Sequence, residues 1–171
     1  MNICMIGFMG SGKTSIGKLV AQRNSMSFAD TDAMLVEREN RTIADIFRDD
    51  GEAYFRDAEH ELVVELSGEG GLTNTVLSTG GGLVIAERNQ EYLKRVGTVV
   101  YLRTSPETIY DRVKDSKNRP LLNTEDKLGR IKEMLEVRGP VYEAAADVIV
   151  DTDGLSRKEV AALVERACGI K

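Results

Sequence analysis

The sequence predicts an α/β protein, a three-layer α/β/α arrangement whose middle layer is a five-stranded parallel sheet. Strand-length apolar segments alternate with longer amphipathic stretches, which is the pattern of strand–helix–strand units. A glycine-rich turn follows the first apolar segment and precedes a helical pattern. The chain has 171 residues, of which 42% are hydrophobic, enough for the packed core of one domain. We therefore expect residues 1–171 to form a single domain.

Five segments have the length and apolar character of buried strands. The second segment is a weaker strand signal than the others. The predicted strands are residues 2–6, 27–29, 75–78, 98–102 and 148–150. Since a helical pattern separates each strand from the next, all five are expected to run parallel.

Hydrophobic periodicity and capping residues predict the helices. They are residues 13–23, 31–39, 42–67 with a break near Gly51, 86–94, 106–114, 125–138 and 157–167. Ser105 before Pro106 fits an N-cap with proline at the first helical position. Ser156 and Glu159 fit a capping box. Both signals favour short connections from a strand to the next helix.

Composition excludes several functional classes. The 23 Lys and Arg residues against 28 Asp and Glu give a net charge of −5, which opposes nucleic acid as the main partner. Cys4 and Cys168 stand near opposite ends without CxxC spacing, and His60 is the single histidine, so no disulfide framework or zinc site is indicated. The apolar run at residues 3–9 is too short for a membrane anchor and lacks a basic leader. We expect a cytoplasmic protein.

The most specific motif, GFMGSGKT at residues 7–14, matches GxxxxGK[ST] between a strand and a helix. Backbone N–H groups and the helix N-terminus of such a loop bind phosphate oxygens, its lysine reaches the terminal phosphates, and its hydroxyl can ligate Mg²⁺. The candidate nucleotide-binding residues here are Gly10, Ser11, Gly12, Lys13, Thr14 and Ser15. The alternative is an incidental glycine-rich turn. Motif and context together favour a phosphate-binding loop, with Thr14 as a metal ligand.

Two carboxylates, Asp30 and Asp32, follow the second predicted strand. Residues i and i+2 of an extended chain project to the same side, so both can face one point above the sheet. One is suited to Mg²⁺, and Asp32 is suited to accept the proton of a hydroxyl that attacks a phosphate, or to orient its oxygen. The alternative is that Asp30 only caps the helix that begins near Thr31.

A second group of candidates comes from a helix and a loop. Arg56 and Glu59 are three residues apart on a predicted helix and can form an ion pair, which in isolation is typical of a solvated surface. The glycines at residues 80–82 close the third strand, at the edge where α/β sheets bind ligands. They allow a ligand to approach the backbone closely, although a plain loop also tolerates them.

Two further arginines lie toward the C-terminal half. Arg119 is in a polar, basic segment, residues 116–124, that is a candidate mobile lid, and Arg138 lies near the end of the next predicted helix. A guanidinium can donate two parallel hydrogen bonds to a carboxylate or phosphate. The alternatives are a solvated loop charge for Arg119 and a cation at a helix C-terminus for Arg138.

Taken together, these motifs resemble the shikimate kinase family over nearly the whole chain. The residues that carry the resemblance are 7–14, Asp30 with Asp32, Phe55 and Arg56 with Glu59, 78–82, 119–122, and Arg138 with Pro140 and Tyr142. The resemblance implies a nucleoside-monophosphate-kinase-like fold with strand order 2-3-1-4-5. It also implies transfer of the γ-phosphate of ATP to the 3-hydroxyl of shikimate, on the route to chorismate and the aromatic amino acids.

On the nucleotide side, the resemblance implies that Lys13 contacts the ATP phosphates. Thr14 would ligate Mg²⁺, with Asp30 helping through water. Arg112 matches the position from which the family stacks an arginine on adenine, and Arg119 would steady the transferring phosphoryl group. Lys13, Asp32 and Arg119 are thus the implied catalytic residues.

On the acceptor side, the resemblance implies that Asp32 contacts the ring hydroxyls and serves as the base. Arg56 and Arg138 would clamp the shikimate carboxylate, and Gly80 and Gly81 would contribute backbone groups. The substrate-binding region would span about 31–60. The resemblance also suggests a monomer.

Two competing functions share the phosphate loop. A gluconate or nucleoside-monophosphate kinase has this loop and a lid, but its substrate does not require the same set of aspartates and arginines. A regulatory module could bind ATP without phosphorylating a small molecule. Shikimate-dependent release of ADP separates these possibilities.

Overall fold

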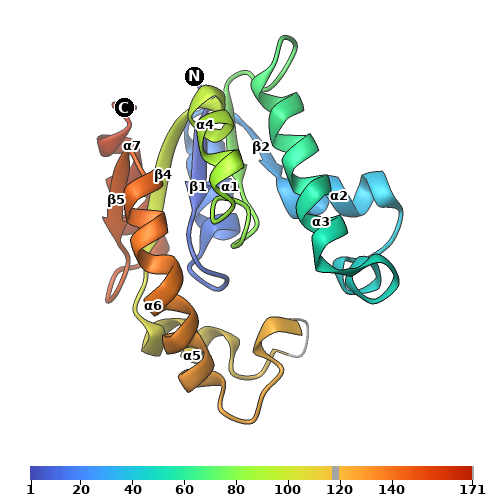
Figure 1. Ribbon diagram of the computed structural model, residues 1–171. Coiled ribbons are helices and arrows are strands. Elements are labelled where there is room, and N and C mark those ends of the chain that lie inside the picture. Colours follow the sequence, from blue (N-terminus) through green and yellow to red (C-terminus); the bar gives the residue numbers. More distant parts are fainter. Residues whose placement is uncertain (117–119, 171) are drawn as a thin grey trace.

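The computed structural model describes residues 1–116 and 120–170, and within them five parallel strands form one sheet (Figure 1). The strands are β1 (Ile3–Ile6), β2 (Ser27–Asp30), β3 (Thr75–Ser78), β4 (Thr98–Arg103) and β5 (Val148–Asp151). Their order is β2-β3-β1-β4-β5, which confirms the predicted order. In the central strand, Cys4 pairs with Leu77 of β3 on one side and with Val99 of β4 on the other.

Apart from the C-terminal end of α6, the helices begin and end close to the predicted positions. They are α1 (Lys13–Arg23), α2 (Thr31–Glu39), α3 (Ile43–Ser67), α4 (Glu87–Val96), α5 (Pro106–Val113), α6 (Lys127–Ala145) and α7 (Arg157–Ala167), with a short 3-10 turn at Pro120–Leu122. The two predicted N-caps and the predicted break near Gly51 are observed in the structure. Ser105 and Ser156 cap α5 and α7, and α3 is interrupted at Gly51, whose φ is 86°.

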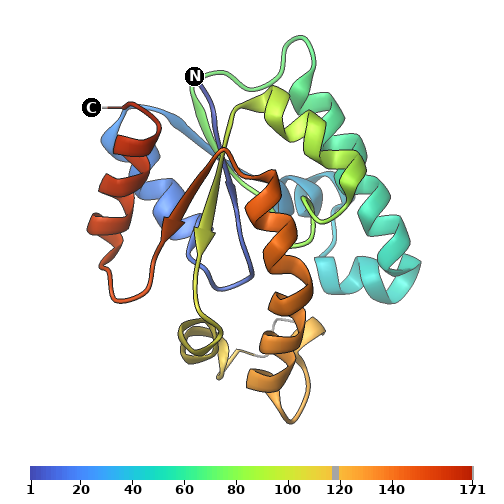
Figure 2. The ribbon, with the colours of Figure 1, turned by 60° about the vertical axis from the view of Figure 1, so that its left-hand side comes forward.

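The hydrophobic core covers both faces of the sheet, and the alternation of side chains along β1 explains why. Ile3 and Met5 point to the face covered by α1 and α7, which lie side by side in Figure 2. Cys4 and Ile6 point to the opposite face, where the core includes residues of α3, α4 and α6. Because both faces are covered, the central strand β1 consists only of apolar residues, and β4 has four consecutive apolar residues.

The predicted end of the sixth helix at Arg138 is wrong, because α6 continues through Pro140 to Ala145. A proline inside a helix removes one backbone hydrogen bond and tends to end or bend it. Here the next turn buries Tyr142 and Ala145 completely or nearly so. The burial of these two side chains offsets the cost of the proline.

The carboxyl ends of the strands meet at one edge of the sheet, where ligands bind in open α/β folds. The phosphate loop leaves β1 at this edge, Asp30 and Asp32 follow β2, and residues 80–82 follow β3 shortly after its end. Among the described residues, no helix combines the length and apolar character needed to span a bilayer.

Candidate active site

The loop between β1 and α1 has the backbone geometry of a phosphate cradle. Gly10 and Gly12 have φ values of 80° and 100°, in the left-handed region that glycine adopts without strain. Gly12 also precedes the first residue of α1, and the helix begins without a side-chain cap. The N-terminus of α1 is therefore built from backbone N–H groups that face the loop, as anion binding requires.

The predicted lysine of this loop is buried and held in place by the loop itself. Lys13 Nζ donates to the carbonyl oxygens of Gly7 at 2.7 Å and Phe8 at 3.0 Å. Both carbonyls belong to the phosphate loop, so the ammonium group lies against this loop rather than in solvent. This position is suited to the terminal phosphates of a nucleotide.

Three side-chain oxygen groups lie close together beside the phosphate loop, those of Thr14, Asp30 and Ser78. Thr14 Oγ1 donates to Asp30 Oδ2 at 3.2 Å and lies 3.5 Å from Ser78 Oγ. Asp30 Oδ1 accepts a hydrogen bond from Ala33 N at 3.1 Å and so caps α2. Asp30 therefore caps α2, while its other oxygen faces Thr14 and stays a candidate metal ligand.

This donor set fits Mg²⁺. Mg²⁺ prefers oxygen ligands and usually takes only one or two from the protein, completing its shell with water and substrate phosphates. Within the described part of the chain, no three His, Cys, Asp or Glu side chains are arranged so that they could hold a metal ion, so these residues offer no all-protein metal cage.

A cavity of about 170 Å³ lies next to the phosphate loop and collects most of the predicted acceptor residues. Its polar lining is Asp32 from α2, Arg56 and Glu59 from α3, residues 80–82 after β3, and Arg138 from α6. Its apolar lining includes Met9, Ile43, Ala44, Phe47, Phe55 and Leu121. These elements are far apart in the sequence, and the sheet edge brings them together.

A second, larger cavity of about 620 Å³ follows the phosphate loop. It is lined by residues of that loop together with Asp30, Ser78, Arg112 and Arg157. Asp32 borders both this cavity and the acceptor cavity. Asp32 therefore marks the boundary between the two cavities.

Arg56 and Glu59 form a close ion pair inside the acceptor cavity. Arg56 Nη1 lies 2.6 Å from Glu59 Oε1, and the two side chains are 21% and 1% exposed. The second oxygen of Glu59 is buried without a hydrogen-bond partner among the described residues. Burial raises the pKa of Glu59 to about 7, against the opposite effect of Arg56, and the charge of Asp32 raises it further. The solvated surface pair considered from sequence is thus excluded.

This raised pKa predicts a specific pH dependence of stability. Between pH 4.5 and about 7 the folded state holds a proton on Glu59 that the unfolded state releases, since the pKa is about 7 in the fold and 4.5 in the free side chain. Above this range Glu59 is ionised and pairs with Arg56. The stabilisation is fully present below pH 4.5 and is lost as the pH rises toward 7. Relative to Glu59→Gln, the wild-type free energy of unfolding should fall by about 3 kcal/mol across this window.

Urea unfolding of both proteins at a series of pH values measures this difference. The matched control is Glu61→Gln, which removes an exposed carboxylate from the same helix and should leave the wild-type pH dependence intact. Parallel curves for wild type and Glu59→Gln would show that Glu59 is ionised throughout.

The glycines after β3 leave space for the charged groups around them. A Cβ atom on Gly80 would lie 2.6 Å from Asp32 Oδ1 and 3.1 Å from Glu59 Oε2. A Cβ atom on Gly82 would lie 2.5 Å from Arg56 Nη1. Real Cβ atoms do not come within 3.0 Å of other non-bonded atoms, so a side chain at Gly80 or Gly82 would displace Asp32 or Arg56 from its position.

Tyr142 explains why α6 continues past Pro140. Its hydroxyl donates to the carbonyl oxygen of Gly81 at 2.5 Å, and its ring stacks on Tyr101 with the centroids 5.1 Å apart. Burial raises the pKa of Tyr142 to about 12, so the hydroxyl keeps the proton that it donates. The last turns of α6 therefore fix the glycine loop that borders the acceptor cavity.

Arg138 lies well inside α6, with its guanidinium 6.0 Å from the ring centroid of Phe8. Its Nη1 atom is buried without a hydrogen-bond partner among the described residues. The alternative role as a cation at a helix C-terminus does not apply, because the helix ends only at Ala145. A buried donor that faces a cavity is suited to an anionic ligand.

Two other residues, Arg112 and Arg119, are predicted for the nucleotide side. Arg112 Nη1 donates to the carbonyl of Gly10 at 3.0 Å and lines a cavity of about 180 Å³ beside Ser15 and Leu155. Arg119 lies outside the described residues. At the C-terminal end of the predicted lid, Leu121 lines the acceptor cavity.

The chain is similar to one known protein family over most of its length. A family model described as shikimate kinase matches residues 9–168. The chain belongs to the shikimate kinase family. Among curated relatives, a shikimate kinase of Thermodesulfovibrio yellowstonii is 43% identical over 160 residues, covering 94% of this chain and 90% of that one. A shikimate kinase of Symbiobacterium thermophilum is 43% identical over 164 residues, covering 95% and 92%.

Solved structures give the same family. Shikimate kinase from Acinetobacter baumannii in complex with shikimate has a TM-score of 0.90 at 34% identity, covering 96% of this chain and 90% of that one. Shikimate kinase from Aquifex aeolicus has a TM-score of 0.82 at 38% identity, covering 98% and 95%. A gluconokinase from Sinorhizobium meliloti reaches only 0.59 at 18% identity, over 98% and 91%, which shows the fold alone.

Within this shikimate kinase fold, the structure adds lining residues that sequence reasoning missed. Ile43, Ala44 and Phe47 form an apolar wall of the acceptor cavity, and Arg157 lines the larger cavity. The apolar residues follow a helical pattern, so they cannot be told from core residues in the sequence. Arg157 follows a capping serine, a signal that predicts a helix and not a site.

Proposed function

We propose that this protein transfers the γ-phosphate of ATP to the 3-hydroxyl of shikimate, giving shikimate 3-phosphate and ADP. The observation that carries the proposal is the position of Asp32, at the boundary between the phosphate-loop cavity and a cavity that holds Arg56 and Arg138. Shikimate is a small anion with several hydroxyls, so it needs cationic groups for its carboxylate and a carboxylate near the reacting hydroxyl. The neighbour from Acinetobacter baumannii, solved with shikimate, supports the same acceptor.

On the donor side, the phosphate loop and the N-terminus of α1 bind the ATP phosphates, and Lys13 neutralises charge on the transferring group. Arg112 faces the base-binding side. Thr14 and Asp30 are the residues that would hold Mg²⁺, with Ser78 beside them. The metal, when bound, supplies charge stabilisation for the phosphates.

On the acceptor side, Arg56 and Arg138 orient the shikimate carboxylate, and the backbone at Gly80 and Gly81 borders the ring. Asp32 accepts the hydroxyl proton as the oxygen attacks the γ-phosphorus. The new oxygen–phosphorus bond forms while the bond to the bridging oxygen of ADP breaks. Most of the catalytic effect comes from positioning and charge stabilisation, because phosphoryl transfer requires little covalent chemistry from the protein.

Several parts of the proposal extend beyond these contacts. Residues 1–171 act as one domain, with the substrate region at about 31–60. Segment 116–124 closes over the site as a lid, and Arg119 steadies the transferring phosphoryl group. The protein acts as a monomer in the cytoplasm, with small molecules rather than nucleic acid or membrane as partners. The acidic net charge of −5 supports the exclusion of nucleic acid.

A coupled ADP-release assay with Mg-ATP tests the function directly. Shikimate, quinate, gluconate and the nucleoside monophosphates are compared in parallel at matched concentrations. We expect strong turnover with shikimate alone. Turnover on gluconate or a nucleoside monophosphate would overturn the acceptor assignment, and ATP binding without any turnover would favour a regulatory module.

Gly82→Ala should weaken shikimate binding without unfolding the protein. The added methyl group forces the guanidinium of Arg56 to move, since the contact of 2.5 Å involves the far end of a flexible side chain. We expect the KM for shikimate to rise about 10-fold, roughly the loss of one charge-assisted hydrogen bond. Gly139→Ala is the control, because a Cβ there meets nothing within 4 Å. Equal KM values for the two variants would contradict the proposed position of Arg56.

A further inference from the structure

The first part of α3 is a separate short helix, residues 43–50, that we call the pocket-wall helix. It ends at Gly51, where φ of 86° and ψ of 171° break the helix, and a Cβ at this glycine would meet nothing within 4 Å. Thr42 caps its other end from an extended conformation. The helix is thus bounded on both sides by non-helical backbone, so its position is not fixed by helical continuity with the rest of α3.

The pocket-wall helix forms one side of the acceptor cavity. Ile43, Ala44 and Phe47 line that cavity, and Phe47 packs edge-to-face against Phe55 at a centroid distance of 5.1 Å. Phe55 belongs to the part of α3 beyond Gly51 and neighbours Arg56. The position of the pocket-wall helix therefore sets the shape of the cavity opposite the arginines.

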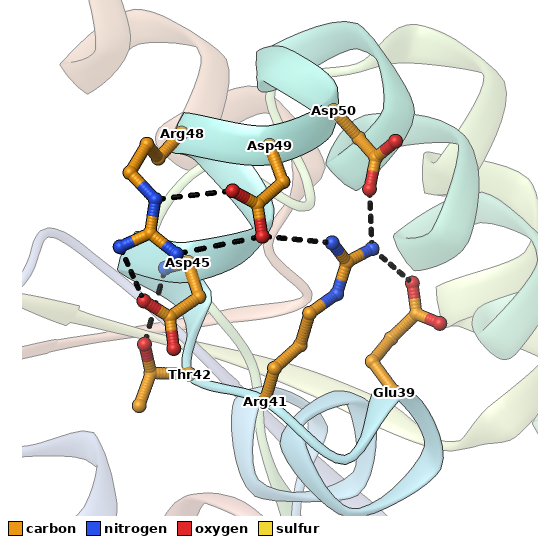
Figure 3. A network of polar contacts seen from close by, with 7 residues as sticks. All are labelled: Glu39, Arg41, Thr42, Asp45, Arg48, Asp49 and Asp50. Carbon is orange, nitrogen blue, oxygen red and sulfur yellow. Dashed lines mark hydrogen bonds and ion pairs between the residues drawn. The ribbon is translucent and has the colours of Figure 1, made fainter.

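Arg41 connects this helix to the end of α2 (Figure 3). Its guanidinium lies 2.5 Å from Asp50, 3.6 Å from Asp49 and 3.4 Å from Glu39, and the side chain is only 24% exposed. Asp49 and Asp50 are the last residues of the pocket-wall helix, whereas Glu39 is the last residue of α2. One cation thus holds together three carboxylates that would otherwise repel one another.

The ion pairs of Arg48, also drawn in Figure 3, differ from those of Arg41. It lies 3.0 Å from Asp45 and 3.0 Å from Asp49, both on the pocket-wall helix, and its side chain is 69% exposed. Its ion pairs join residues of one helix and do not connect that helix to another element. Exposed pairs of this kind contribute little.

We propose that Arg41 is a positioning residue for the acceptor pocket. Through Asp49 and Asp50 it holds the pocket-wall helix against the end of α2, and so keeps Ile43, Ala44 and Phe47 where shikimate binds. The proposal rests on the proposed function for its kinetic consequence. Arg41 does not line the acceptor cavity, so it acts on affinity and not on the phosphoryl transfer step.

Arg41→Gln and Arg48→Gln form a matched pair for steady-state kinetics. For Arg41→Gln we expect the KM for shikimate to rise about 5- to 10-fold, with kcat and the KM for ATP within about 2-fold of wild type. For Arg48→Gln we expect all three constants within about 2-fold. Equal shikimate KM values for the two variants would overturn the proposal.

Salt and a second substitution separate positioning from a general loss of charge. Raising NaCl from about 0.05 to about 0.5 M should raise the shikimate KM more steeply in wild type and Arg48→Gln than in Arg41→Gln. The double variant Arg41→Gln with Asp50→Asn should be no worse than Arg41→Gln alone, because both changes break the same contact. Additive effects would contradict a shared contact.

Amide hydrogen exchange gives a readout that needs no activity. Arg41→Gln should increase exchange in residues 43–50 and leave the second part of α3 unchanged, whereas Arg48→Gln should not. If Arg41→Gln does not fold, Arg41→Lys replaces it, with an intermediate effect expected because a lysine cannot reach three carboxylates at once. Absence of shikimate turnover in wild type would remove the proposed function, while unchanged exchange in both Arg41 variants would remove the positioning role.

Discussion

Replacing Asp32 by asparagine should lower kcat by about 10²- to 10⁴-fold and leave the KM for ATP within about 2-fold of wild type. The asparagine has nearly the same size, but it cannot accept a proton from the attacking hydroxyl. Asp32 borders both cavities, so the change acts where acceptor and phosphate meet and not on the phosphate loop. The substitution therefore removes stabilisation of the transition state and leaves ATP binding unchanged.

Steady-state kinetics with each substrate varied in turn measures this effect. Asp57→Asn is the control, because Asp57 is an exposed carboxylate of α3 that pairs with Arg88. Thermal unfolding checks the fold, since Asp32 also lies in the first turn of α2, where a negative charge stabilises the helix by about 0.3 to 1 kcal/mol. A normal kcat in Asp32→Asn would exclude this carboxylate from proton transfer.

Much of the fold could be predicted from local patterns, because caps and periodicity are local properties. The bounds of α1, α2 and α7 match the prediction, each beginning directly after a glycine loop, an aspartate cap or a capping box. Strand order is different, since an alternation of strands and helices permits several orders. The order came from the family resemblance and not from the pattern itself.

The end of α6 shows where local reasoning fails. A Gly-Pro pair predicts a stop, and nothing nearby in the sequence reveals that Tyr142 reaches Gly81, 61 residues away. Only tertiary contacts determine that the helix continues. The same contact fixes the glycine loop, so the failed prediction lies at a part of the molecule that borders the candidate site.

The residues of the candidate site also divide into those that could be predicted from the sequence and those that could not. Residues with distinctive chemistry, such as Lys13 and Asp32, could be selected from motifs. For Arg56 and Glu59 the sequence left a surface pair open, and the burial that decides against it depends on helices that pack around them. The apolar wall around Phe47 carries no chemical signal at all, because its side chains are the same as those of any core helix.

Replacing Arg138 by alanine should raise the KM for shikimate by about 30-fold or more, corresponding to at least 2 kcal/mol of lost binding. Nη1 of Arg138 is already buried and without a hydrogen-bond partner among the described residues. This nitrogen is therefore already removed from water before shikimate binds. Pairing it with the substrate carboxylate costs little further desolvation, so most of the interaction free energy contributes to binding affinity. Arg56 differs, because Glu59 and Glu52 already share its charge. We expect Arg56→Ala to have the smaller effect.

Direct binding of shikimate in the presence of ADP, measured by calorimetry, separates affinity from turnover. Arg138→Lys keeps the charge but loses the planar fork, so its affinity should fall between those of wild type and Arg138→Ala. Arg130→Ala, which removes an exposed arginine of α6 paired with Glu133, serves as the control and should bind as wild type does. A larger loss in Arg56→Ala than in Arg138→Ala would mean that Arg56, and not Arg138 with its unpaired Nη1, is the main anchor of the carboxylate.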